Sequence, residues 1–153
     1  MTAETEPAPR AFPAGDAMTR DAIARFLTRS FPQVFCAHDI VVTAAERGAA
    51  TLTLTPGDQH LRPGNVVSGP TLMMLADAAA YAALLSVSAS ATMAVTSNLN
   101  ISFVRGAPAG GAIVQTANVI KSGRRLSVIV CEASTADGTL LAHATTTYAM
   151  AAS

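Results

Sequence analysis

Residues 66–87 read VVSGPTLMMLADAAAYAALLSV, an almost wholly apolar run that carries one carboxylate, Asp77, near its middle. Ser68 is suited to the N-cap position of a helix and Pro70 to the first turn, so we predict a helix from Gly69 to about Val87. A helix that is apolar on nearly every face must be enclosed by other elements. An unpaired charge in such an interior costs several kcal/mol, so Asp77 is exposed, paired or retained for chemistry.

A membrane span is the other interpretation of this run, and the charges argue against it. Asp77 would lie near the bilayer centre at a cost of roughly 2.5 to 3.5 kcal/mol, and no Lys or Arg between Arg62 and Arg105 flanks the segment. We therefore predict a buried core helix. Glu4 and Glu6 stand where a signal peptide would be basic. Residues 1–15 are predicted to form a flexible tail, and a cytoplasmic location is expected.

The rest of the chain alternates between helical and strand-like patterns. Residues 18–30 predict a short amphipathic helix that ends at Phe31-Pro32, and residues 34–55 predict a hairpin around Arg47-Gly48. Four more strands are predicted at 93–104, 112–121, 125–135 and 139–150. The short turns between the last three make them antiparallel. The predicted fold is α+β, with one domain over residues 16–153 and an antiparallel sheet around the long helix.

Charge and spacing exclude several classes of function. The ten Lys and Arg residues balance the ten Asp and Glu residues, which leaves no electrostatic footprint for nucleic acid or an anionic membrane. His38, His60 and His143 lie too far apart in the sequence to form a metal-ligand motif, and no cofactor is called for. Cys36 and Cys131 sit in apolar surroundings and are interpreted as buried thiols.

The segment HLRPGNVVSGPTLMMLADAAAYAAL resembles the signature of the PaaI-like hotdog acyl-CoA thioesterases. In that family a His-Gly-Gly step opens the helix, and an acidic residue follows nine positions after the His. Here Ser68-Gly69-Pro70 occupies the step and Asp77 the acidic position. The similarity continues through MAVTSNLNISFVRGAPAGG and VIKSGRRLSV to HATTTYAM. It implies a hotdog fold, in which an antiparallel sheet wraps a long central helix. Ser68 replaces the family's His, and Arg62 replaces an Asn six residues before it.

The resemblance also implies roles for two residues. Asp77 would be the general base for water, or a nucleophile that forms a mixed anhydride. The alternative is a structural carboxylate held by backbone N–H groups at a dimer interface. Thr96 matches the position whose hydroxyl holds the attacking water beside the acidic residue of a neighbouring subunit. The alternative for Thr96 is an ordinary strand residue with a satisfied hydroxyl.

The start of the long helix supplies further candidates. The N–H of Gly69 could polarise a thioester carbonyl, although a glycine there could simply permit a tight entry before Pro70. Ser68 is interpreted as an N-cap or as a hydroxyl that contacts substrate. His60, Arg62 and Asn65, on the loop into the helix, are predicted to border the substrate.

A basic cluster surrounds the predicted turn at Ser122-Gly123. It consists of Lys121, Arg124 and Arg125. Guanidinium groups suit phosphate oxygens, and the resemblance implies that this turn lines the groove for the CoA phosphates. The alternative is a solvated hairpin tip.

The predicted function is hydrolysis of an acyl-CoA or related thioester, with each site built across a subunit interface of a homodimer. A homotetramer formed by two dimers is also expected. The alternative is a non-catalytic acyl-CoA binding protein, which the replacements at Ser68 and Arg62 favour. A hydratase would need a His near the helix start, and none occurs between residues 61 and 142. No Gly-x-Ser-x-Gly motif supports a serine hydrolase.

Overall fold

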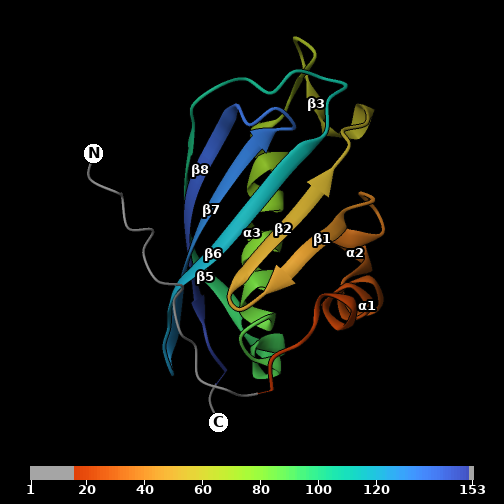
Figure 1. Cartoon of the computed structure of the whole chain (residues 1–153). Helices are drawn as coiled ribbons and strands as arrows, with labels where there is room; N and C mark the ends of the chain where they lie inside the picture. The colour runs from red at the N-terminus through yellow and green to blue at the C-terminus, as the bar shows by residue number, and fades with distance from the viewer. Residues whose placement is uncertain (1–15, 152–153) are drawn as a thin grey trace, which may run out of the picture.

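The computed structural model describes residues 16–151 and consists of a six-stranded antiparallel sheet packed against one long helix (Figure 1). The helices are α1 (Arg20–Ser30), α2 (Pro32–Phe35) and α3 (Gly69–Leu85), with 3-10 turns η1 (Asp58–His60) and η2 (Ala89–Met93). The sheet contains β1 (Val41–Glu46), β2 (Ala49–Leu54), β5 (Val95–Phe103), β6 (Ile113–Ser122), β7 (Leu126–Thr135) and β8 (Leu140–Ala149). A separate small hairpin joins β3 (Leu61–Arg62) to β4 (Val66–Val67). This architecture confirms the predicted α+β hotdog fold.

The strand order β1-β2-β6-β7-β8-β5 follows from short turns and one long crossover. Arg47 and Gly48 both have positive φ, as a tight hairpin turn between β1 and β2 requires, and Gly48 supplies the conformation at no steric cost. Between β2 and β6 the chain leaves the sheet to form α3 and then re-enters it as β5. Strand β5 returns antiparallel to β8, at the edge opposite β1. The last three strands are antiparallel neighbours, as predicted.

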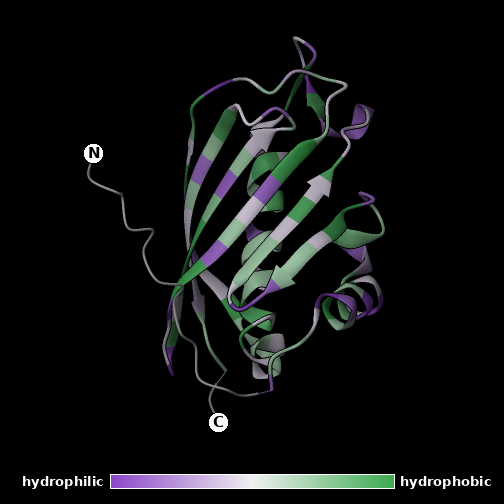
Figure 2. Ribbon diagram, viewed as in Figure 1, coloured by the Kyte–Doolittle hydropathy of each residue, from purple (hydrophilic) through white to green (hydrophobic). Residues whose placement is uncertain are grey.

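Helix α3 supplies much of the core through its small side chains. Six of its alanines are buried, together with Leu72, Leu75, Leu84 and Leu85, against the inward residues of the strands. Figure 2 shows the matching alternation of apolar and polar residues along the strands. The sheet wraps α3, as predicted, but leaves one side of the helix open, where Met73 is 39% exposed and Asp77 and Tyr81 are only partly buried. These three residues mark a face of α3 that the sheet leaves open.

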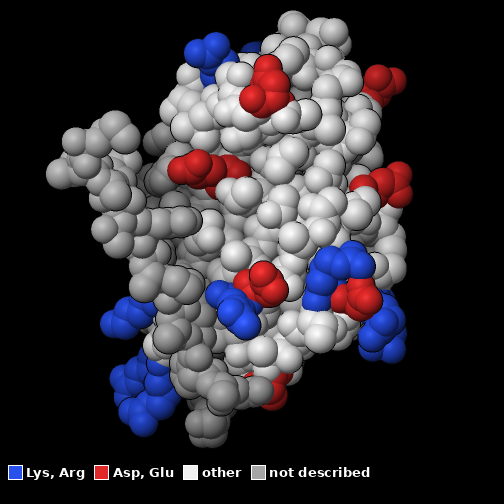
Figure 3. All heavy atoms as spheres, viewed as in Figure 1, with Lys and Arg blue, Asp and Glu red and all other residues white. Residues whose placement is uncertain are grey.

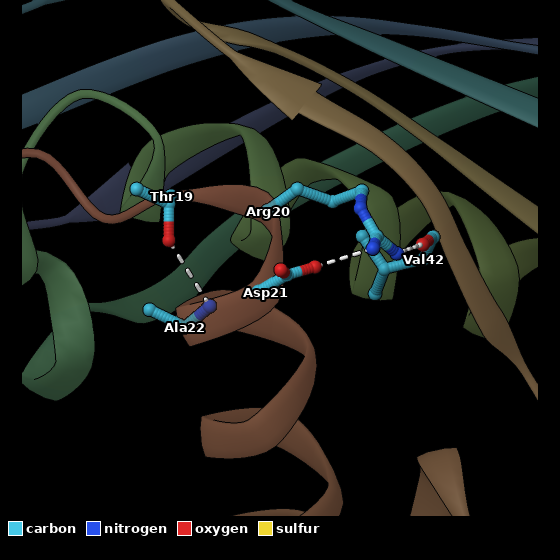
Figure 4. Close-up of polar contacts among 5 residues, drawn as sticks. All are labelled: Thr19, Arg20, Asp21, Ala22 and Val42. Atoms are coloured by element: carbon cyan, nitrogen blue, oxygen red, sulfur yellow. Dashed lines mark hydrogen bonds and ion pairs between the residues drawn. The ribbon is translucent and has the colours of Figure 1, made fainter.

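Helix α1 is fixed at its start by two contacts (Figure 4). Thr19 is the N-cap, and its hydroxyl accepts a hydrogen bond from the N–H of Ala22. Arg20 donates to the carbonyl of Val42, which lies on the edge strand β1, and also pairs with Asp21. The helix thus covers the β1 edge. Ile23 and Leu27 of α1 are fully buried, as the amphipathic pattern predicts.

Several boundaries differ from the prediction. Residues 34–40 form part of α2 and a turn rather than a strand, because Pro32 starts a new helical turn instead of ending the helical region. Both cysteines are free thiols, but Cys36 is exposed, and only Cys131 is buried. The predicted flexible tail at residues 1–15 lies outside the described residues. None of the helices between residues 16 and 151 is both long and apolar enough to span a bilayer.

Candidate active site

Asp77 lies on the open face of α3 and borders a cavity of about 330 Å³. The cavity lies where α1, α3, the start of β5 and the end of β8 meet. Its lining residues are Phe26, Ser30, Phe31, Asp77, Tyr81, Ala94, Val95, Thr96 and Tyr148. Asp77 is the one charged residue among them, so the carboxylate faces an otherwise uncharged, largely apolar space. Ligand pockets commonly have this composition, with a few polar groups set among apolar and aromatic ones.

The Asp77 carboxylate is held by two hydroxyl groups. The Thr96 hydroxyl donates to Asp77 Oδ1 at 2.6 Å, and the Tyr148 hydroxyl lies 2.8 Å from the same oxygen. The structural alternative, in which backbone N–H groups hold the carboxylate, is therefore not what the described residues show. Thr96 contacts Asp77 of its own chain. Its expected role beside the acidic residue of a neighbouring subunit stays a prediction.

The register of the sheet brings the two hydroxyls together. Thr96 is directly opposite Tyr148 in the pairing of β5 with β8, and a bulge follows at Ser97. A bulge re-aims the side chains next to it. One turn further along α3 from Asp77, Tyr81 lies on the same face and stacks on Tyr148 with ring centroids 6.1 Å apart. Phe26 of α1 meets Tyr81 edge-on at 6.3 Å. Aromatic packing thus fixes the cavity wall around the carboxylate.

Burial changes the titration of the groups behind Asp77. Burial, and next the neighbouring Asp77 carboxylate, raise the pKa of the Tyr148 hydroxyl far above its usual value. Burial also raises the pKa of the Cys131 thiol to about 12. Cys131 therefore stays protonated, and its thiol lies 3.5 Å from the carbonyl oxygen of Ala76. Burial raises the pKa of Tyr81 as well, and its hydroxyl donates to the carbonyl of Thr92 at 2.6 Å.

Ser68 and Gly69 lie at the start of the same helix, whereas Asp77 lies at its middle. Gly69 precedes Asp77 by eight positions, which is about 12 Å along an α-helix. The Ser68 hydroxyl accepts from the N–H of Thr71 at 3.3 Å, so the N-cap interpretation is confirmed. A Cβ on Gly69 would lie 3.3 Å from the ring of Phe103, a tight contact. Neither residue lines the Asp77 cavity.

The three loop residues predicted to border the substrate lie beyond that helix start. Arg62 and Asn65 are exposed, and Asn65 has a positive φ of 59° in the β3–β4 turn. His60 is buried, and its Nε2 lies 2.9 Å from Nδ1 of His38. None of the three lines the Asp77 cavity, so within one chain they form a group separate from Asp77 and Thr96. Their contact with substrate stays a prediction.

The basic turn lies nearer to the cavity. Lys121, Arg124 and Arg125 are exposed where β6 joins β7, and Figure 3 shows basic side chains over this lower left end of the molecule. The next residue, Leu126, pairs with Ala149, which pairs with Val95 of the cavity wall. Two steps between strands span about 10 Å. A Cβ on Gly123 would lie 2.5 Å from the Leu126 carbonyl oxygen, so the turn requires glycine at this position.

Sequence reasoning missed the aromatic part of the site. Phe26, Phe31, Tyr81 and Tyr148 all line the cavity, and they include both tyrosines of the chain. Tyr148 lies on the inward face of β8 with Ala144 and Thr146, a pattern typical of core packing. A buried tyrosine needs a partner for its hydroxyl, which was the one available signal. Within residues 16–151, no group of three or more His, Cys, Asp or Glu side chains is placed to hold a metal ion.

Several known proteins share this fold. A candidate thioesterase from Silicibacter sp. superposes with a TM-score of 0.80 and 30% identity, over 88% of this chain and 93% of that one. The PaaI protein of E. coli, from the phenylacetic acid degradation operon, superposes with a TM-score of 0.73 and 24% identity, over 85% of this chain and 97% of that one. A hypothetical thioesterase from Streptococcus pneumoniae, solved with coenzyme A, superposes with a TM-score of 0.74 and 15% identity, over 82% of this chain and 96% of that one.

A search of curated proteins found no match. The family model of the thioesterase superfamily matches residues 64–142, just over half of the chain, and this range contains Asp77, Thr96 and the basic turn. The chain therefore belongs to the thioesterase superfamily and has its hotdog fold.

Proposed function

We propose that this protein hydrolyses acyl-CoA thioesters and that Asp77 is its general base or nucleophile. The observation that carries the proposal is the Asp77 carboxylate, which is partly buried at the wall of a 330 Å³ uncharged cavity and oriented by Thr96. A structural carboxylate would gain nothing from facing an open cavity, whereas a base or nucleophile must reach its substrate there.

The chemistry has two balanced forms. As a base, the carboxylate removes a proton from water while the water oxygen attacks the thioester carbonyl carbon; the C–S bond then breaks, and the proton passes to the departing thiolate. As a nucleophile, a carboxylate oxygen attacks that carbon directly and displaces the thiolate. Water then cleaves the resulting mixed anhydride and restores the carboxylate.

Coenzyme A is the proposed leaving group. The basic turn formed by Lys121, Arg124 and Arg125 lies near the cavity, where guanidinium and ammonium groups can pair with phosphates. The protein from Streptococcus pneumoniae shares this fold and holds coenzyme A. Both observations support an acyl-CoA over a small thioester that lacks a nucleotide.

The carbonyl oxygen also needs a hydrogen-bond donor, and the Asp77 cavity of one chain does not contain Gly69. We propose that a second copy of the chain brings its helix start to this cavity, so that Gly69 of one subunit faces Asp77 of the other. The exposed β5 edge, with Val95 and Phe103 on it, is the surface through which the two copies would pair. A tetramer of two such dimers remains part of the proposal.

The proposal is tested by release of free thiol from acetyl-CoA, hexanoyl-CoA and phenylacetyl-CoA, with wild-type protein and Asp77→Asn. Asn keeps the size and still accepts from both hydroxyls, so we expect a folded variant whose kcat falls at least about a hundredfold. Thermal melts of the same preparations serve as the control for folding. Wild-type turnover in a stable Asp77→Asn protein would remove Asp77 from the mechanism.

Binding without hydrolysis is the second candidate function, because Ser68 and Arg62 stand where the resembling family has His and Asn. Calorimetry with coenzyme A distinguishes the two. Binding of coenzyme A by a wild-type protein that releases no thiol from any of the three substrates would favour the binding protein.

A further inference from the structure

Tyr148 lies directly behind the proposed catalytic carboxylate. Its side chain is 3% exposed, and its hydroxyl lies 2.8 Å from Asp77 Oδ1 and 3.0 Å from the Asp77 carbonyl oxygen. A hydroxyl carries one proton and can donate it to one acceptor at a time. The carboxylate is both the nearer and the charged acceptor, so the proton is directed to Oδ1.

The two donors act on the same carboxylate oxygen. The Thr96 hydroxyl donates to Oδ1 from β5, and the Tyr148 hydroxyl donates to it from β8. Within the described residues, Oδ2 has no hydrogen-bond partner among the side chains. Two donors on one oxygen fix the plane of the carboxylate and occupy the oxygen that they bind. The other oxygen stays available to water or substrate.

We propose that Tyr148 is a positioning residue that, together with Thr96, holds Asp77 Oδ1 and leaves Oδ2 as the reactive oxygen. This inference rests on the proposed hydrolysis. In the base form of the reaction, Oδ2 takes the proton from water as the water oxygen bonds to the thioester carbon. The electron pair of the broken C–S bond leaves with sulfur, and the thiolate then recovers the proton from Oδ2.

The surroundings keep Tyr148 a donor throughout. Its pKa is raised by burial and by Asp77, so the hydroxyl remains protonated whenever the carboxylate is charged. The other titratable groups in contact with this region are Tyr81, whose hydroxyl is engaged by Thr92, and the protonated thiol of Cys131. No Lys, Arg or His lines the cavity among the described residues. Asp77 is therefore the one charged group that the cavity presents to a substrate.

The first test is Tyr148→Phe, with Tyr81→Phe as its matched control. Both changes delete one hydroxyl from a cavity tyrosine and keep the ring, but only the Tyr148 hydroxyl is hydrogen-bonded to Asp77. Tyr148→Phe removes one of the two donors that stabilise the charged carboxylate, so the acid limb of kcat should move to higher pH in this variant. We expect kcat to fall about tenfold, the effect of one charge-assisted hydrogen bond, with KM for hexanoyl-CoA little changed. In Tyr81→Phe the acid limb of kcat should lie at the same pH as in the wild type.

The second test strengthens the hydrogen bond instead of removing it. In the Tyr81→Phe background, Tyr148 is the only tyrosine of the chain, so 3-fluorotyrosine added during expression labels this position alone. The fluorinated phenol is a stronger acid and a stronger donor, and its size is close to that of tyrosine. The acid limb should therefore move to lower pH, opposite to the effect of Tyr148→Phe.

The fluorine also gives a readout that needs no turnover. The position of its NMR resonance should depend on pH in the wild-type sequence at position 77, and Asp77→Asn should abolish this dependence. If the wild type releases no thiol, the proposed function fails, and the fluorine titration alone decides whether Tyr148 holds Asp77. An acid limb that moves in neither variant, or a fluorine signal indifferent to Asp77, would overturn the positioning role.

Discussion

At the scale of single residues, the pair formed by His60 and His38 shows how hydrogen bonds set a charge state. His60 Nδ1 accepts from the N–H of Gly57 at 2.9 Å, so in this arrangement its proton is on Nε2, which donates to His38 Nδ1. A second proton on His60 would displace the Gly57 hydrogen bond. Burial, and next the neighbouring His38, lower the pKa of His60 below its usual 6.5. His60 also supports the start of α3, since its carbonyl accepts from the N–H of Ser68 at 2.8 Å.

This pair predicts a loss of stability in mild acid. At pH values between the lowered pKa of folded His60 and the unfolded value of 6.5, the unfolded chain binds more protons than the folded chain. The contribution of His60 to the free energy of unfolding is therefore complete above pH 6.5 and declines below it. The melting temperature should fall from pH 7.5 to pH 5.5, and less steeply in His60→Asn, whose side-chain oxygen can replace the Nδ1 acceptor. His143→Asn, on the exposed side of β8, is the control. An unchanged slope in His60→Asn would show that His60 does not carry the effect.

Residue roles could be predicted from the sequence only where one residue stood out from its surroundings. Asp77 did so as a single carboxylate in an apolar run, and Thr96 followed from the resemblance. Tyr148 did not, because inward alternation on β8 predicts burial but not which hydroxyl meets which carboxylate. That contact depends on the β5–β8 register, which the sequence of β8 alone does not contain.

At the scale of elements, α3 is defined sharply at its start. Ser68 caps the helix, its hydroxyl lies 2.8 Å from that of Thr71, and Pro70 occupies the first turn. The helix ends at Leu85, and the N–H of Ser86 returns to the carbonyl of Ala82. The predicted helix therefore agreed with the structure to within two residues. The site depends on this definition, because the helix start fixes how far Asp77 lies from Gly69.

The N-cap predicts a measurable effect on stability. Ser68→Ala should cost about 1 kcal/mol, which lowers the melting temperature of a domain of this size by about 2–4 °C. Ser68→Asn keeps a capping oxygen and should recover most of the loss. Thermal melts and thiol release on the three proteins separate capping from catalysis. If Ser68→Asn restores the melting temperature but not kcat, the Ser68 hydroxyl contacts the substrate as well.

Elements with a regular pattern were predictable, and those made by distant contacts were not. Strands β6, β7 and β8 were predicted to within one residue at either end, because each alternates over most of its length. The small hairpin of β3 and β4 was missed. It is completed by contacts with the chain after β5, where the N–H of Val67 donates to the carbonyl of Ala107 and Val66 bridges to Pro108. Such short strands carry no periodicity of their own.

At the scale of the whole molecule, the two edges of the sheet differ. The β1 edge lies against α1, and Arg20 donates a hydrogen bond to one of the carbonyl groups of this edge. The β5 edge has no neighbouring element on its outer side among the described residues. Seven of the nine residues of β5 are exposed, including Val95 and Phe103, and Met73 lies on the open face of α3. An uncovered edge strand with exposed apolar residues is suited to pair with a strand of another chain.

At this scale we predict that two chains form a dimer through β5 and that activity depends on this dimer. Phe103 is 50% exposed and lies beside Gly69, so Phe103→Glu would place a charge both in the proposed interface and next to the proposed carbonyl donor. We expect light scattering to show a smaller assembly for Phe103→Glu and thiol release to fall at least about tenfold, since a buried unpaired charge disfavours association. Val41→Glu is the matched control, because Val41 is 55% exposed on the opposite edge strand and lies away from the site. It should keep the wild-type mass and kcat. A wild-type protein that is fully active as a single chain would contradict the shared site, and Gly69 would then have no route to Asp77.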